Sequence, residues 1–100
     1  MGYQIDFYDK TKNLVIEFQG DYWHCNPNKY DKDFFHNVKK LTAEEIWEYD
    51  QNKKNFICKE LNNPIYLQIW ESDYRNDPQK IIKEILLYYN IKLNDDEYAI

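Results

Sequence analysis

Hydrophobic and polar residues alternate in two short stretches near the N-terminus, which predicts a pair of β-strands. Strict alternation runs through residues 2–8 and again through residues 14–19, as in strands with one apolar face. The segment between them, residues 9–13, consists of turn-forming residues. We therefore expect the two strands to pair as an antiparallel hairpin.

The two faces of these strands predict the register of the hairpin. A four-residue loop pairs Tyr8 with Val15 and Asp6 with Glu17, and it keeps the apolar side chains together. A three-residue loop would set Asp6 opposite Ile16 and mix the faces. In the favoured register the Cβ atoms of Asp6 and Glu17 lie about 5 Å apart, a spacing at which two carboxylates can share one cation. The shared apolar face consists of Tyr3, Ile5, Phe7, Leu14, Ile16 and Phe18.

A long polar loop over residues 21–41 precedes a predicted helix. A loop of this length in a small domain is usually functional. Thr42 and Glu45 form the capping box of a helix that runs to about Leu61. Asp50 falls on the apolar stripe of this helix, so its carboxylate needs a partner. The candidate partners are His24, Lys53, Lys54 and Arg75.

The remaining residues predict one strand and one helix. Residues 65–70 are apolar on both faces, which is typical of a central strand. Asp77 and Pro78 begin a last helix that ends near Asn90, and residues 91–100 are expected to be a loosely held acidic tail. The predicted fold is α/β, with a β-hairpin and a central strand in a short mixed sheet and two packed helices, in one domain of residues 1–90.

Composition and charge narrow the class of protein. One hundred residues make one small domain. No apolar run is long enough to span a membrane, and no secretory signal pattern is present, so we expect an intracellular protein without a membrane partner. Cys25 and Cys58 are expected to be free thiols. The net charge of −5 counts against a stand-alone DNA binder, although a bound cation would offset an acidic site.

Asp6, Glu17 and Gln19 lie on one face of the predicted hairpin and are candidates for a divalent-metal site. Mg²⁺ prefers oxygen ligands and is commonly held by one or two carboxylates with water and substrate phosphate. Bound metal polarises a phosphoryl oxygen and activates water. The alternative is a solvated sheet face that carries acids by chance.

His24 follows the second strand and is the candidate general base. A carboxylate that orients an imidazole is a recurring arrangement, and the inward Asp50 can supply it. The alternative for His24 is a packing residue beside Trp23. A zinc site built from His24, Cys25, His36 and Cys58 fits no closed finger or ribbon spacing.

Aromatic and basic residues near His24 are candidate DNA contacts. Tyr22 and Trp23 can stack on or wedge between bases, or they can close the end of the core. Lysines of the long loop can meet phosphates, or they can simply be solvated. The lysines in question are Lys29, Lys32, Lys39 and Lys40.

Four blocks of the chain, residues 5–7, 16–27, 42–50 and 69–73, resemble a known family in order and spacing. They are similar to the very-short-patch-repair-type endonucleases and the related nuclease domains of phage and giant-virus homing endonucleases. These enzymes belong to the PD-(D/E)xK, restriction-endonuclease-like superfamily. The resemblance implies a Mg²⁺-dependent DNA endonuclease or nickase, with Mn²⁺ as a substitute.

The resemblance also implies roles for individual residues. Asp6 matches the family's metal-binding aspartate, and the segment around Glu17 matches the second metal-binding segment, where the backbone carbonyl of Phe18 completes the metal shell. Gln19 stands where the wider superfamily has lysine and would position water or phosphate. The remaining matches are His24 as the base, Asp50 as its orienting acid, and Tyr22 and Trp23 as the aromatic pair pressed into DNA.

One departure from the family concerns the start of the core. The superfamily core usually has a helix and a strand before the strand of Asp6, and here five residues precede it. The expected fold is therefore a trimmed core whose hairpin has an exposed edge, open to a second copy or a completing partner chain. The alternative function is a catalytically weak or inactive module that binds nucleic acid or a partner.

Overall fold

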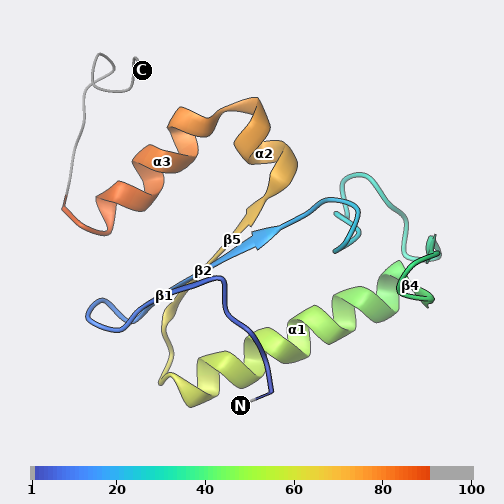
Figure 1. Cartoon of the computed structure of the whole chain (residues 1–100), viewed down its shortest axis with the longest axis horizontal. Helices are drawn as coiled ribbons and strands as arrows, with labels where there is room; N and C mark the ends of the chain where they lie inside the picture. The colour runs from blue at the N-terminus through green and yellow to red at the C-terminus, as the bar shows by residue number, and fades with distance from the viewer. Residues whose placement is uncertain (1, 91–100) are drawn as a thin grey trace.

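A three-stranded sheet with β2 at its centre organises the fold (Figure 1). The computed structural model describes residues 2–90, so the expected acidic tail lies outside the described residues. Strand β1 pairs antiparallel with β2, and β5 pairs parallel with β2. The elements in chain order are β1 (Phe7–Asp9), β2 (Leu14–Gln19), β3 (Phe35–His36), β4 (Leu41–Thr42), α1 (Ala43–Glu60), β5 (Ile65–Trp70), α2 (Glu71–Asn76) and α3 (Pro78–Leu87).

The hairpin has the predicted register, with Tyr8 opposite Val15 and Phe7 opposite Ile16. Asn13 closes its turn with a positive φ of 49°, a conformation that asparagine tolerates better than most residues. The first strand is shorter than predicted, because β1 begins only at Phe7. Asp6 lies in a bend immediately before the strand.

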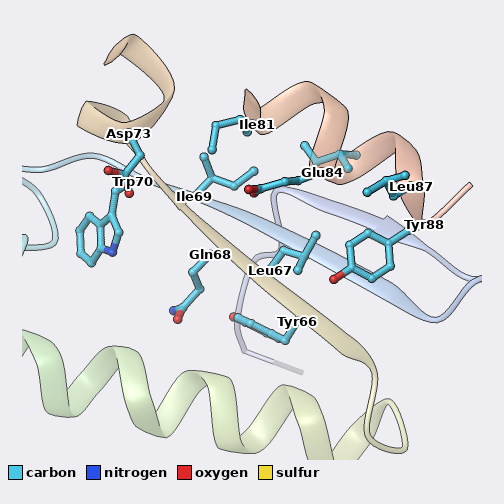
Figure 2. A pocket seen from close by; sticks show the side chains of 11 residues that line it. Tyr66, Leu67, Gln68, Ile69, Trp70, Asp73, Ile81, Glu84, Leu87 and Tyr88 are labelled. Carbon is cyan, nitrogen blue, oxygen red and sulfur yellow. The ribbon is translucent and has the colours of Figure 1, made fainter. Parts of the chain in front are cut away.

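Strand β5 lies at the edge of the sheet within residues 2–90, so its prediction as a central strand was wrong. Both faces of β5 carry apolar residues because helices lie on both sides of the strand, and not because strands flank it on both edges. Figure 2 shows Leu67 and Ile69 directed toward α3, and Tyr66 and Gln68 directed toward α1. A cleft of about 610 Å³ separates β5 from α3.

Helix α1 covers the face of β2 that carries Val15, Glu17 and Gln19, all of which are buried. The sheet face predicted to be apolar is the more open one, where Phe7 and Phe18 are 46% and 47% exposed. Glu17, the acid of β2, therefore does not lie on a solvated surface. A separate cluster of Cys25, Ala43 and Ile46 forms the core beneath the long loop.

The helix boundaries follow the predicted capping signals closely. Thr42 and Glu45 make both hydrogen bonds of the capping box, and α1 ends at Glu60 with Leu61 as its C-cap. Asp77 caps α3 by accepting from the Lys80 N–H. Within residues 2–90, no helix has both the length and the apolar character required to cross a bilayer.

Three elements, β3, β4 and α2, were not predicted from the sequence. Residues 21–41 are not wholly irregular, because β3 and β4 pair as a short two-stranded sheet. A short helix, α2, precedes α3, and an ion pair of 2.7 Å joins Arg75 to Glu71 one turn earlier. The last helix itself ends at Leu87, three residues before the predicted end.

Candidate active site

His24 and Asp50 form a hydrogen-bonded pair between the loop after β2 and the middle of α1. His24 Nδ1 lies 2.9 Å from Asp50 Oδ2. A carboxylate only accepts hydrogen bonds, so Nδ1 carries the hydrogen and Nε2 of the neutral ring remains an acceptor. The inward carboxylate predicted on α1 thus has His24 as its partner. Among the alternatives, Lys53 contacts Glu17 and Arg75 contacts Glu71.

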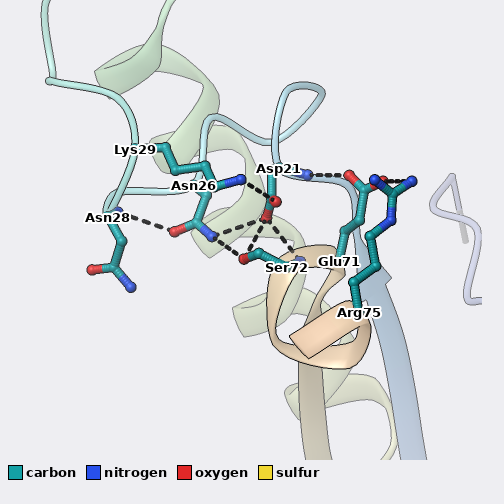
Figure 3. Close-up of polar contacts among 7 residues, drawn as sticks. All are labelled: Asp21, Asn26, Asn28, Lys29, Glu71, Ser72 and Arg75. Carbon is teal, nitrogen blue, oxygen red and sulfur yellow. Dashed lines mark hydrogen bonds and ion pairs between the residues drawn. The ribbon is translucent and has the colours of Figure 1, made fainter. Parts of the chain in front are cut away.

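Asp21 holds the loop of His24 in place (Figure 3). Its carboxylate accepts from Asn26 Nδ2 at 2.9 Å and from Ser72 Oγ at 3.2 Å, and Lys29 Nζ lies 3.0 Å away. Burial opposes ionisation of Asp21, but the bonds from Asn26, Lys29 and Ser72 together lower its pKa. The cluster ties the end of β2 to the start of α2.

Backbone hydrogen bonds complete this turn. The His24 N–H donates to the Gly20 carbonyl at 3.0 Å, and the Asn26 N–H donates to the Asp21 carbonyl at 2.8 Å. His24 is therefore positioned by a closed turn directly after β2. Asn26 and Ser72 both lie within matched sequence blocks, but neither was assigned a role, because only tertiary structure brings Ser72 to Asp21.

Glu17 and Gln19 present two buried side-chain oxygens without hydrogen-bond partners. The residues are 3% and 6% exposed, and Glu17 Oε1 and Gln19 Oε1 each lack a partner. Buried polar atoms are normally satisfied, so these oxygens are available to an ion or a water molecule. The Lys53 ammonium lies 3.4 Å from Glu17 Oε1. Alternate residues of a strand share a face, which places both oxygens on the α1 side of β2.

Asp6 lies next to this strand at its open edge. Its Oδ2 accepts from the Phe18 N–H at 2.8 Å. The N–H and C=O of one strand residue point to the same side, so the Phe18 carbonyl is also directed toward the edge where Asp6 lies. The ladder between β1 and β2 extends no further than the pair Phe7–Ile16. Asp6, Glu17 and the Phe18 carbonyl can thus supply oxygen ligands from neighbouring positions.

The electrostatics of Glu17 match a site for a cation. Burial raises the pKa of Glu17, the Lys53 ammonium partly offsets this effect, and the charge of Asp6 adds to it. A nearby positive charge would therefore stabilise the ionised carboxylate. Burial, followed by the charge of Glu17, also raises the pKa of Tyr66, so this phenol stays protonated at neutral pH.

An open cleft of about 150 Å³ lies beside the His24–Asp50 pair. At about 30 Å³ for each water molecule, it has room for roughly five waters. Sequence reasoning missed Gln68, which lies opposite Glu17 in the parallel register and reaches the cleft from β5. The signal available in the sequence was a polar amide in a strand that was predicted to be apolar on both faces. The cleft is lined by Gln19, His24, Pro27, Trp47, Asp50, Gln51, Gln68 and Trp70.

The candidate DNA contacts differ in their accessibility. Trp23 is 49% exposed, whereas Tyr22 stacks on the buried ring of His36, with centroids 4.1 Å apart. Lys29 is engaged with Asp21. Lys39 and Lys40 are exposed and follow the β3 strand. The structure therefore brings Gln19, His24 and Asp50 together, and it leaves Trp23 as the accessible aromatic residue of the pair.

Within residues 2–90 no group of three or more His, Cys, Asp or Glu side chains is arranged to hold a metal ion. A cation at Asp6 and Glu17 would therefore complete its shell with carbonyl, amide or water oxygens, which suits Mg²⁺. No protein-family model, curated protein or solved structure matches the chain. The family resemblance accordingly rests on the four sequence blocks alone.

Proposed function

We propose that this chain is a metal-dependent phosphodiesterase that nicks or cleaves DNA. The observation that carries the proposal is the His24–Asp50 pair, 2.9 Å apart, beside a cleft that Gln19 also lines. A neutral imidazole with a free Nε2 and an oriented Nδ1 is suited to remove a proton from water. The cleft beside it has room for such a water.

Four residues have distinct roles in this proposal. His24 Nε2 accepts the proton of the attacking water, and Asp50 stabilises the resulting imidazolium. Gln19 holds the water or a phosphate oxygen through its amide. Asp21 keeps His24 at the end of β2 through its bonds to Asn26 and Ser72.

The oxygen atoms of Asp6, Glu17 and Phe18 fit a Mg²⁺ ion, with Mn²⁺ as a substitute. All are hard donors, and Glu17 Oε1 is buried without a hydrogen-bond partner. When bound, such an ion supplies charge stabilisation to the phosphoryl group and lowers the pKa of water. Asp6 and Glu17 contribute the negative charge that retains the ion.

DNA is proposed as the substrate from the sequence resemblance and from the exposed Trp23 beside His24. The finer assignment is a homing or mismatch-repair-like nuclease of phage or viral type. We assign the activity to an intracellular setting, in keeping with the free thiols of Cys25 and Cys58.

Nicking of a supercoiled plasmid by the full chain tests the proposal. We expect nicked product with Mg²⁺ or Mn²⁺ and none with EDTA. Asp6→Asn should abolish nicking while the protein stays folded, because the amide can still accept from the Phe18 N–H but lacks the charge for the metal. His24→Ala, purified in parallel, controls for contaminating nuclease. Full cleavage by folded Asp6→Asn would refute the assignment.

A second candidate function is a non-catalytic module that is completed by another chain. It is favoured by the edge position of β5 within residues 2–90. It is also favoured by the exposed rings of Phe18 and Tyr74, whose centroids lie 6.0 Å apart. Exposed edges and apolar patches are typical of interaction surfaces. Absence of metal-dependent nicking, with stable association to DNA or to a second copy, would support this alternative.

A further inference from the structure

Lys53 of α1 extends its ammonium group to the carboxylate of Glu17. The distance from Lys53 Nζ to Glu17 Oε1 is 3.4 Å, and the Lys53 side chain is 20% exposed. This is the same Glu17 oxygen that lacks a hydrogen-bond partner. The two groups are thus close enough to attract each other electrostatically, at a distance longer than that of most hydrogen bonds.

The position of Lys53 follows from the packing of α1 on β2. Asp50 and Lys53 lie three residues apart and so share one face of the helix. Asp50 meets His24 near the end of β2, and Lys53 meets Glu17 further back along the strand. The neighbouring Lys54 points elsewhere, with its ammonium 5.5 Å from the ring centre of Tyr66.

We propose that Lys53 is an internal counter-ion of the Asp6–Glu17 carboxylate pair, which a divalent cation must displace. This inference rests on the proposed function, because it assumes that these carboxylates bind the metal. The loose contact and the partial exposure of Lys53 allow its flexible side chain to move toward solvent. Metal binding is then an exchange of one cation for another, and Lys53 lowers the affinity for the metal.

As a consequence, the buried carboxylate of Glu17 has a positive charge beside it both without metal and with metal bound. Without metal, Lys53 limits the cost of burying the Glu17 charge. With metal, the ion replaces the ammonium, which no longer competes for Glu17. Removing Lys53 should therefore weaken the metal-free fold and strengthen metal binding, two effects of opposite sign.

The test measures Mn²⁺ binding to the full chain from the EPR signal of free Mn²⁺. We expect Lys53→Met to bind Mn²⁺ about tenfold more tightly than the wild type, a typical size for coupling between two competing ligands. In EDTA the Tm of Lys53→Met should fall, and added Mn²⁺ should raise it more than in the wild type. Lys54→Met removes a neighbouring charge that does not contact Glu17 and should leave the affinity unchanged.

The possible outcomes separate this proposal from the proposed function. Wild-type binding that is lost in Asp6→Asn, with unchanged or weaker binding in Lys53→Met, would overturn the role of Lys53 and leave the metal site intact. Equal binding by the wild type and Asp6→Asn would overturn both. Should Lys53→Met fail to fold, Lys53→Gln keeps a hydrogen-bond donor for Glu17 without the charge and should show the same tighter binding.

Discussion

At the scale of single residues, the contact between His24 and Asp50 has a chemical consequence beyond packing. Nδ1 is committed to the carboxylate at 2.9 Å, so Nε2 is the only ring nitrogen left to accept a proton. The ring is partly exposed and lines a cleft of a size suited to water. A histidine held in this way can accept a proton from water through Nε2.

Asp50→Asn tests whether this contact serves catalysis. We expect kcat for plasmid nicking to fall about 100-fold, since general base catalysis contributes factors of this order and a neutral amide cannot stabilise the imidazolium. KM for DNA should change little, because Asp50 faces His24 and is not proposed to contact DNA.

The matched control is Glu48→Gln, which removes an exposed carboxylate from the same helix. It should leave kcat close to the wild-type value. A general effect of charge on α1 would instead lower the activity of both variants equally. Equal activity of Asp50→Asn and the wild type would show that His24 does not depend on Asp50.

At the scale of elements, the turn after β2 depends on Asp21. Its carboxylate joins Asn26 and Lys29 of the loop to Ser72 of α2. A buried carboxylate with three partners stabilises the fold only while it is ionised. Acid should therefore weaken the connection between this loop and α2.

Comparison of Asp21→Asn with the wild type measures the pH dependence of this connection. The partners of Asp21 lower its pKa below the ordinary value of 3.8, so its stabilisation is present above pH 3.8 and is lost as the pH falls through the lower folded-state pKa. We expect Asp21→Asn to reduce the free energy of unfolding by about 1–3 kcal/mol at pH 7, as measured by urea denaturation. This difference should shrink in acid below pH 3.8.

Asp33→Asn is the control, because Asp33 is an exposed aspartate of the same long loop. Its free energy of unfolding should match that of the wild type throughout the pH range. A difference between Asp21→Asn and the wild type that stays constant into strong acid would argue against an ionised Asp21 in the folded protein.

Local patterns in the sequence predicted the elements that depend on neighbours along the chain. Alternation gave the hairpin register of Tyr8 with Val15, and the capping box gave the start of α1. The inward position of Asp50 followed from helical periodicity. In each case the determining contacts lie within one element or between two strands joined by a short turn.

The features that the sequence did not predict depend on tertiary structure. Apolar residues on both faces of β5 indicate cover by helices on two sides, but they do not say whether another strand pairs at its edge. Helix α2 is too short to have a recognisable period. Gln68 and Ser72 join the site only because β5 returns parallel to β2, and the pairing of Lys53 with Glu17 depends on how α1 crosses the sheet.

At the scale of the whole molecule, helices lie on both sides of the sheet, and the His24 site lies on the α1 side (Figure 1). The chain has a net charge of −5 at pH 7, which repels the DNA backbone. Lys29, one of the basic residues near the site, is engaged with Asp21. The proposed binding of DNA must therefore draw on something other than a basic surface.

We expect a bound divalent cation to supply that attraction. Ca²⁺ takes the same oxygen ligands as Mg²⁺ with longer and more flexible bonds, so it should support binding with little cleavage. Fluorescence anisotropy with a labelled duplex at constant ionic strength should show an affinity about tenfold higher in Ca²⁺ than in EDTA. Asp6→Asn should lose this gain, since it lacks the charge that holds the ion.

Trp23→Ala separates contact by the aromatic ring from attraction by the cation. The ring is about half exposed beside His24, and stacking on a base contributes about 1–3 kcal/mol. We expect this variant to bind DNA more weakly in both Ca²⁺ and EDTA while keeping the gain from Ca²⁺. Equal affinity of the wild type in Ca²⁺ and EDTA would contradict the cation's role, because the acidic molecule would then hold DNA through a surface distant from Asp6 and Glu17.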